Sequence, residues 1–65
     1  MKEFQQRVTN ELSELKNKTD MLNDFVGYNP EFLKIDKDEQ ERLRLQLDIM
    51  WQYVEILRER IAAFR

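Results

Sequence analysis

The chain has 65 residues, a formal net charge of −2, no Cys and no His. A single domain of this size has difficulty outweighing the entropy of ordering its backbone. Without Cys and His, the chain has neither disulfides nor the usual Cys/His zinc sites to support it. Oligomerisation is the kind of support that remains.

The charge and hydropathy pattern also limits the partners. The net charge of −2 gives no field for nonspecific capture of duplex nucleic acid. No run approaches the roughly 20 apolar residues that span a bilayer, and MKEFQQRV is too polar for the apolar segment of a signal peptide. We therefore expect a soluble, intracellular protein that has no membrane or duplex nucleic acid as a partner.

The first segment has the pattern of an amphipathic helix, which we expect over residues 2–26. Apolar residues recur there at steps of three and four, as on one helical face. The only glycine, Gly27, follows directly, where a left-handed C-terminal cap is favoured. The residues on this face are Met1, Phe4, Val8, Leu12, Leu15, Leu22 and Val26, with Thr19 filling the gap.

Residues 27–36 are expected to form the connector. Asn29 before Pro30 resembles the cap and first position of a short helical turn over residues 30–34. Phe32 and Leu33 are then placed to plug the open end of a hairpin.

The second helix is expected over residues 37–64, beginning after a capping box formed by Asp36 and Glu39. Its apolar residues alternate steps of four and three in an unbroken heptad pattern, which requires a partner helix. A connector of this length folds the two helices antiparallel. The sequence thus predicts one all-α domain over residues 1–65, an antiparallel two-helix hairpin with a short connector helix. The heptad residues are Leu43, Leu47, Met50, Val54, Leu57, Ile61 and Phe64.

A second apolar stripe on the same helix consists of Leu45, Ile49, Tyr53 and Ile56, and we call it the α2 stripe. With both stripes, the helix is apolar over about 200° of its circumference, whereas one partner helix covers about half of that. Burying each large apolar side chain is worth about 1.5–3 kcal/mol. We therefore expect a homo-oligomer with the α2 stripe at the interface, either a twofold dimer or a ring of dimers.

Residue chemistry offers little basis for catalysis. The chain has no His or Cys, no Gly-rich phosphate loop and no G-x-S-x-G elbow. Carboxylates are abundant, but on charged helices they usually form solvated faces. We expect a protein that is not an enzyme and has no cofactor or catalytic metal.

Arg7, Glu11, Glu14 and Lys18 place charges of both signs along one flank of the first helix. A surface charge ladder is the simpler interpretation, worth a few tenths of a kcal/mol per pair. In the alternative, Arg7 and Lys18 face an anionic ligand at a subunit boundary.

Arg42, Arg44 and Tyr53 also have two interpretations. The two arginines either form a solvated face balanced by neighbouring carboxylates or recognise phosphate, for which guanidinium groups are well shaped. Arg42 is the better candidate because it points toward the α2 stripe. A Tyr at helical spacing is more often a core or interface residue than a platform for base stacking.

Three segments carry a resemblance that covers nearly the whole chain. FQQRV at Phe4 to Val8, DEQERLRLQ at Asp38 to Gln46 and ILRERIAAF at Ile56 to Phe64 resemble very small phage-encoded helical hairpins. That family is related to the phage sponge proteins that counter CBASS and Thoeris defence by sequestering cyclic nucleotide signals.

The resemblance implies a homo-oligomer, typically a hexamer, in the cytoplasm of an infected bacterial host. It would bind cyclic oligonucleotide or cyclic ADP-ribose-type signals in pockets between protomers without cleaving them. Basic residues would contact the phosphates, and aromatic residues the bases. The matching candidates are Arg7, Lys18, Arg42 and Arg44 for phosphates, and Phe4 and Tyr53 for bases.

A second hypothesis is a non-catalytic interaction module, a phage adaptor or inhibitor whose exposed helix face binds a host protein. It uses the same α2 stripe, so a hairpin that stays monomeric would favour it. An engineered scaffold is disfavoured, because the Gln, Asn and Thr residues of the first helix are less regular than designed sequences.

Overall fold

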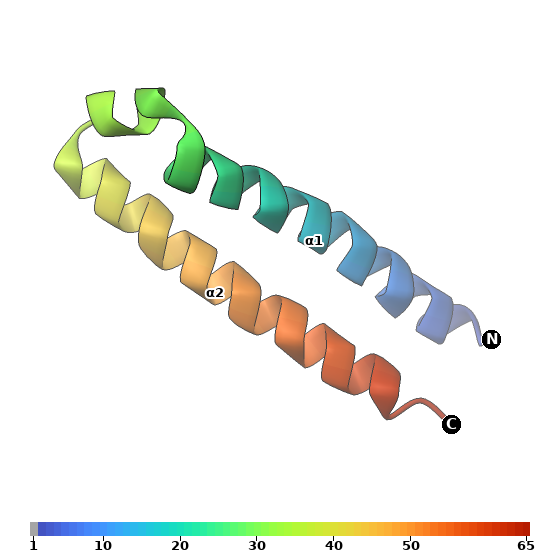
Figure 1. Cartoon of the computed structure of the whole chain (residues 1–65). Coiled ribbons are helices and arrows are strands. Elements are labelled where there is room, and N and C mark those ends of the chain that lie inside the picture. The colour runs from blue at the N-terminus through green and yellow to red at the C-terminus, as the bar shows by residue number, and fades with distance from the viewer. Residues whose placement is uncertain (1) are drawn as a thin grey trace.

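The fold is an antiparallel pair of long helices, described for residues 2–65 by a computed structural model (Figure 1). Helix α1 spans Glu3–Tyr28, the 3₁₀ helix η1 spans Pro30–Lys34, and α2 spans Lys37–Ala62. The two chain termini lie together at the end opposite η1. The predicted all-α hairpin with a short connector helix is confirmed for a single chain. Met1, which the pattern placed on the first helix, lies outside the described residues.

The hairpin is a rod. Its extents are 47 × 15 × 14 Å, and its radius of gyration is 14.7 Å. A compact domain of the same length would have a radius of gyration of about 11 Å. Most side chains therefore lie on the surface of a two-helix layer rather than inside a core.

The end of α1 differs from the prediction. The helix continues through Gly27 to Tyr28, and no glycine in residues 2–65 has positive φ, so the predicted left-handed cap at Gly27 is wrong. Asn29 ends the helix with extended backbone (φ −90°, ψ 119°), while its N–H donates to the Phe25 carbonyl at 3.4 Å. The cause is Pro30, because a proline disfavours the α region for the residue before it.

The start of α2 is only partly as predicted. Asp36 caps the helix through Oδ2, which accepts from the backbone N–H of Asp38 at 3.1 Å. Glu39 does not complete a capping box; its Oε1 accepts from Arg42 Nε at 2.7 Å. At the other end α2 stops at Ala62, two residues before the predicted end at residue 64.

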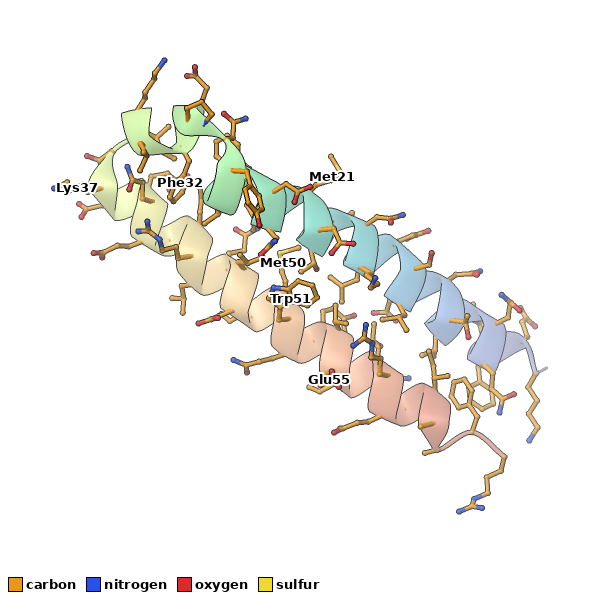
Figure 2. The ribbon with its side chains drawn as sticks, in the orientation of Figure 1. Met21, Phe32, Lys37, Met50, Trp51 and Glu55 are labelled. Atoms are coloured by element: carbon orange, nitrogen blue, oxygen red, sulfur yellow. The ribbon has the colours of Figure 1, made fainter. Side chains whose placement is uncertain are left out.

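The predicted heptad residues lie toward α1, six of them in α2 and the seventh, Phe64, just beyond its end. Val54 and Leu57 are completely buried, and the other five are half-buried because only one helix covers them. Met50 and Trp51 lie on the side of α2 that faces α1, whereas Met21 points away from it (Figure 2). On α1, the buried position between Leu15 and Leu22 is Thr19, whose Oγ1 donates to the Leu15 carbonyl at 2.7 Å. That hydrogen bond satisfies the only polar atom its side chain brings into the interface.

Two buried glutamines connect the ends of the hairpin. Gln40 Nε2 donates to the Ile35 carbonyl at 2.9 Å beside the connector. Gln5 Nε2 donates to the Arg65 carbonyl at 3.4 Å beside the termini, while its Oε1 accepts from the Lys2 N–H at 3.2 Å. Among the described residues, no buried side-chain nitrogen or oxygen lacks a partner. These contacts hold both ends of the rod closed.

Phe32 closes the connector end, as predicted, but Leu33 does not. Phe32 is 1% exposed, and its ring meets Phe25 edge to face with centroids 5.9 Å apart. The Arg44 guanidinium lies over the Phe32 ring, 5.0 Å from its centroid. Leu33 is 73% exposed and points outward, because a short helical turn can direct only one of two adjacent residues inward.

We predict that Phe32→Ala lowers the free energy of unfolding by about 3–5 kcal/mol, the usual loss when a fully buried Phe is truncated. Urea unfolding followed by circular dichroism measures this change. Leu33→Ala is the matched control in the same turn and should change stability by less than about 0.5 kcal/mol. Equal losses for the two variants would contradict the assignment of Phe32 as the plug.

Candidate functional site

The α2 stripe is exposed in the single hairpin, as its helical position predicted. Leu45 is 61% exposed, Ile49 56%, Tyr53 41% and Ile56 53%. These are large apolar side chains in a row on one helix, whereas exposed apolar residues on a monomeric surface are usually scattered. One chain therefore leaves a continuous apolar surface uncovered.

The Phe4–Phe64 contact shows which flanks of the two helices border the same face. The rings pack edge to face with centroids 6.0 Å apart. At about 100° per residue, Arg7 and Lys18 project from the same flank of α1 as Phe4. Arg42 and Tyr53 project from the flank of α2 that borders Phe64, which lies just beyond the end of this helix. We call this side the Phe4 face; it carries Phe4, Arg7, Lys18, Arg42 and Tyr53.

Along the rod, these residues fall into three groups. Phe4 and Arg7 lie near the termini, and Arg42 lies near the connector, at opposite ends of a 47 Å molecule. Lys18 and Tyr53 lie near the middle. The terminal contacts of Phe4 and Gln5 set a register that puts Lys18 within about one helical turn of Tyr53 along the rod. A single hairpin brings only this pair together.

The two end arginines make exposed ion pairs on their own helices. Arg7 lies 3.8 Å from Glu3, with both side chains more than two-thirds exposed. Arg42 lies 2.7 Å from Glu39. Arg7 thus pairs one turn toward the N-terminus, rather than with Glu11 as in the predicted ladder. Such pairs are worth a few tenths of a kcal/mol, so a stronger anionic partner can displace either carboxylate.

Lys18 differs from the arginines. In the described part of the chain it takes part in no ion pair, and it is exposed. Its predicted neighbour in the charge ladder, Glu14, is also exposed and one turn away. An ammonium group without a carboxylate partner is available to an anion, and Tyr53 offers an aromatic ring at the same level of the Phe4 face.

Arg44 lies away from the other candidates. Its helical position is on the opposite face of the hairpin, and its guanidinium group stacks on the buried ring of Phe32. A cation–π contact of this kind stabilises the connector and occupies one side of the planar guanidinium. The structure therefore gives Arg44 a structural contact.

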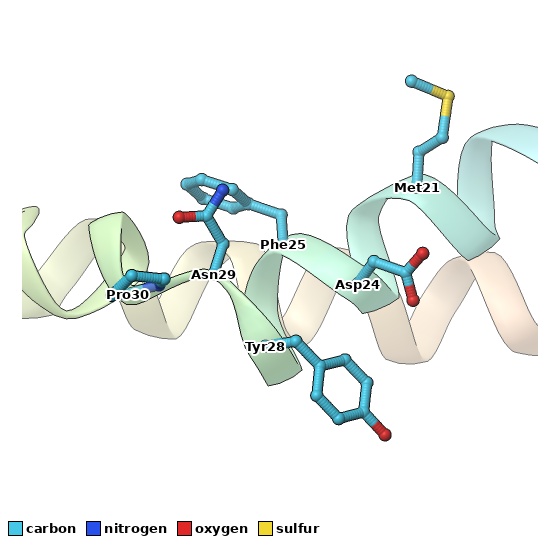
Figure 3. A pocket seen from close by; sticks show the side chains of 6 residues that line it. All are labelled: Met21, Asp24, Phe25, Tyr28, Asn29 and Pro30. Atoms are coloured by element: carbon cyan, nitrogen blue, oxygen red, sulfur yellow. The ribbon is translucent and has the colours of Figure 1, made fainter.

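Two features were not singled out from the sequence. Arg60 is exposed and lies seven residues after Tyr53, which places it on the same flank and could have been recognised from that spacing. A shallow hollow, wide open to solvent, lies on the outer side of α1 near the connector (Figure 3). Met21 and Tyr28 extend from opposite sides of it and are 73% and 82% exposed. Its lining residues are Met21, Asp24, Phe25, Tyr28, Asn29 and Pro30.

Residues 2–65 contain neither a grouped set of metal-binding side chains nor a membrane-length apolar helix. No three side chains of the types that commonly bind metals are grouped so as to hold an ion there. No helix in the same range has the length and apolar content needed to cross a bilayer.

We predict that Arg44 and Phe32 are energetically coupled and that Arg42 and Phe32 are not. A double-mutant cycle combining Arg44→Gln with Phe32→Leu should give a coupling free energy of about 0.5–1 kcal/mol, because each single change already removes the cation–π contact. The same cycle with Arg42→Gln should give a coupling within about 0.3 kcal/mol of zero. Urea unfolding measures both, and similar coupling in the two cycles would contradict a structural role specific to Arg44.

Comparison with known families gives one match. The model of a family described as Sequestin matches residues 2–63, which is nearly the whole hairpin. Searches of curated proteins and of solved structures gave no match. The matched region contains both helices, the connector, the α2 stripe and all the residues of the Phe4 face. On this match, the chain belongs to the sequestin family.

Proposed function

We propose that this protein is a phage anti-defence sponge that binds cyclic oligonucleotide or cyclic ADP-ribose-type immune signals and holds them without cleaving them. The family name is compatible with a sequestering protein. The observation that carries the proposal further is Lys18, a cation without an ion-pair partner in the described chain, level with Tyr53 on one face.

The chemistry of this pair fits such signals. Cyclic nucleotides combine phosphate or pyrophosphate anions with planar bases. The Lys18 ammonium group would neutralise a phosphate oxygen, and the Tyr53 ring would stack on a base, an interaction worth about 1–3 kcal/mol. Binding without reaction is supported by the chain's composition, which includes no His or Cys to act as nucleophile or proton carrier.

Enclosure of the ligand requires more than one chain. Small-molecule sites usually bury about 70–90% of a ligand's surface, and the Phe4 face of a lone rod is open to solvent. We propose a homo-oligomer in which the Phe4 faces of neighbouring copies border a shared cleft. A sponge works by mass action, so its dissociation constant must be lower than the concentration at which the host effector responds.

The competing proposal is an interaction module that binds a host protein. The open hollow near the connector favours it, because Met21 and Tyr28 are exposed on the outer side of α1, away from α2. In that case ligand binding would be absent, and Met21→Ser with Tyr28→Ser would abolish the phage-protective effect without changing the mass of the assembly.

The sponge proposal predicts a rise in melting temperature with at least one ligand from a panel of cyclic di- and trinucleotides and cyclic ADP-ribose isomers. The same ligand, recovered after denaturation, should be chemically intact by mass spectrometry. AMP and linear dinucleotides serve as controls. No thermal shift with any panel member at millimolar concentration would contradict the proposal, and a cleaved product would contradict sequestration.

Lys18→Ala and Tyr53→Phe test the two ligand residues. We expect Lys18→Ala to weaken binding about tenfold through loss of a phosphate contact. Tyr53→Phe keeps the ring and should bind within about threefold of the parent, whereas Tyr53→Ala should lose tenfold or more. Lys16→Ala is the matched control, since Lys16 projects from the opposite flank of α1 and pairs with Asp20. Calorimetric titration with the panel ligand measures all four.

A further inference from the structure

The residues along the α2 stripe are placed symmetrically about its middle, and this arrangement indicates what kind of partner can cover it. Three members of the stripe, Leu45, Ile49 and Ile56, are the apolar part of a second heptad pattern, spaced by alternating steps of three and four, and Tyr53 lies beside it. Its positions are arranged in pairs about a point between residues 50 and 51. Leu45 lies as far before that point as Ile56 lies after it, and Ile49 and Gln52 are related in the same way. The outermost pair of this pattern is Arg42 and Glu59.

We propose that a second copy of this chain docks along the α2 stripe, with the two α2 helices antiparallel and Arg42 of each copy beside Glu59 of the other. A twofold axis would then cross between residues 50 and 51. Every layer of the interface would combine unlike residues: Leu45 with the partner's Ile56, and Ile49 with the partner's Gln52. The paired segment, from Arg42 to Glu59, would be about 27 Å long.

Charge selects this direction over the parallel one. In a parallel pair related by a twofold axis, each residue would face its own copy, so Arg42 would meet Arg42 and Glu59 would meet Glu59. Like charges at these positions oppose association. In the antiparallel pair both ends carry opposite charges. In the single hairpin Arg42 holds only Glu39, in an exposed pair, and is free to add a second carboxylate.

The exposed surface area of the hairpin is consistent with a second copy covering the α2 stripe. The hairpin exposes 5220 Å². A compact monomer of 8.0 kDa would expose roughly 4,500 Å² by the usual scaling. The excess, roughly 700–800 Å², is close to the roughly 800 Å² that each partner buries in a standard stable interface. The apolar side chains that the pairing would cover are more than half exposed in the single hairpin: Leu45, Ile49 and Ile56.

The pairing also has a consequence for the ligand cleft, and this consequence rests on the proposed sequestering function. On α2, the α2 stripe and the side facing α1 are about 130° apart, and Tyr53 lies between them, toward the Phe4 face. In an antiparallel pair, equivalent flanks border the same face, so the Phe4 faces of both copies would open into one trough. Lys18 and Tyr53 of each copy would lie within about one turn of the twofold axis. Two cations and two rings related by twofold symmetry suit a small anion carrying two bases.

Charge reversal tests the pairing without any ligand. Arg42→Glu and Glu59→Arg each place like charges at both ends of the antiparallel pair, so each should raise the dissociation constant of the assembly roughly tenfold. The double variant Arg42→Glu/Glu59→Arg restores both pairs and should return the constant to within about threefold of the parent. It still carries a glutamate beside Glu39, so recovery cannot come from the local ion pair. Sedimentation equilibrium over a range of protein concentrations measures each constant.

Controls separate folding from docking. Asp24→Arg makes the same charge change as Glu59→Arg, but Asp24 lies on the outer side of α1, away from the α2 stripe, so the constant should stay within about threefold of the parent. Equimolar Arg42→Glu and Glu59→Arg chains should associate more tightly than either does alone, which also shows that both fold. Circular dichroism confirms that helix content is unchanged.

Each outcome decides the proposal. Antiparallel docking is supported if both single variants raise the dissociation constant and the double variant returns it to near the parent value. The proposal would be overturned if the single variants associated like the parent, or if the double variant kept a raised dissociation constant. A parent chain that is monomeric at high micromolar concentration would also overturn it. Because these measurements contain no ligand, they are independent of the nucleotide panel. An assembly with the predicted charge pattern but no thermal shift would leave the docking in place and remove the sponge function.

Discussion

The structure depends on one constraint: α2 has more apolar circumference than a single neighbouring helix can cover. Its heptad residues pack against α1, where Val54 and Leu57 are completely buried, while the α2 stripe stays on the surface with every member at least 41% exposed. Within residues 2–65 the remaining element is the short η1 at the connector, and it leaves the stripe uncovered. The fold of one chain and the proposed docking of a second copy therefore have the same origin, and the proposed ligand cleft would form where copies meet.

The two ends of the rod are held by different means from its centre. At the connector, Phe32 is enclosed by Phe25 and Arg44, and at the termini Gln5 and the Phe4–Phe64 contact join the two helices. One of these contacts uses Arg44, a candidate phosphate-binding residue in the sequence, to stabilise the connector. They leave Lys18 and Tyr53, in the middle of the Phe4 face, as the pair that combines a cation and an aromatic ring. That division separates residues that keep the hairpin together from residues that remain available to the proposed ligand.

The sequence predicted the elements well, because apolar spacing along a helix determines which residues face its partner. Both helices, the turn after Pro30 and the exposure of the α2 stripe followed from that spacing. Predictions that depended on local backbone competition were less successful. Gly27 was assigned a left-handed cap, but Pro30 controls where α1 ends, and Glu39 pairs with Arg42 instead of completing the cap at Asp36. The contact of Arg44 with Phe32 could not be predicted either, because it depends on how the connector folds back in three dimensions.

The central claim is that identical chains cover the α2 stripe. The most direct measurement is the mass of the unmodified protein by light scattering from low to high micromolar concentration, without ligand. An even multiple of the 8.0 kDa chain mass, persisting on dilution to low micromolar concentration, is the predicted result. A stable mass of one chain across the whole range would contradict the claim, because the α2 stripe would then be tolerated in water.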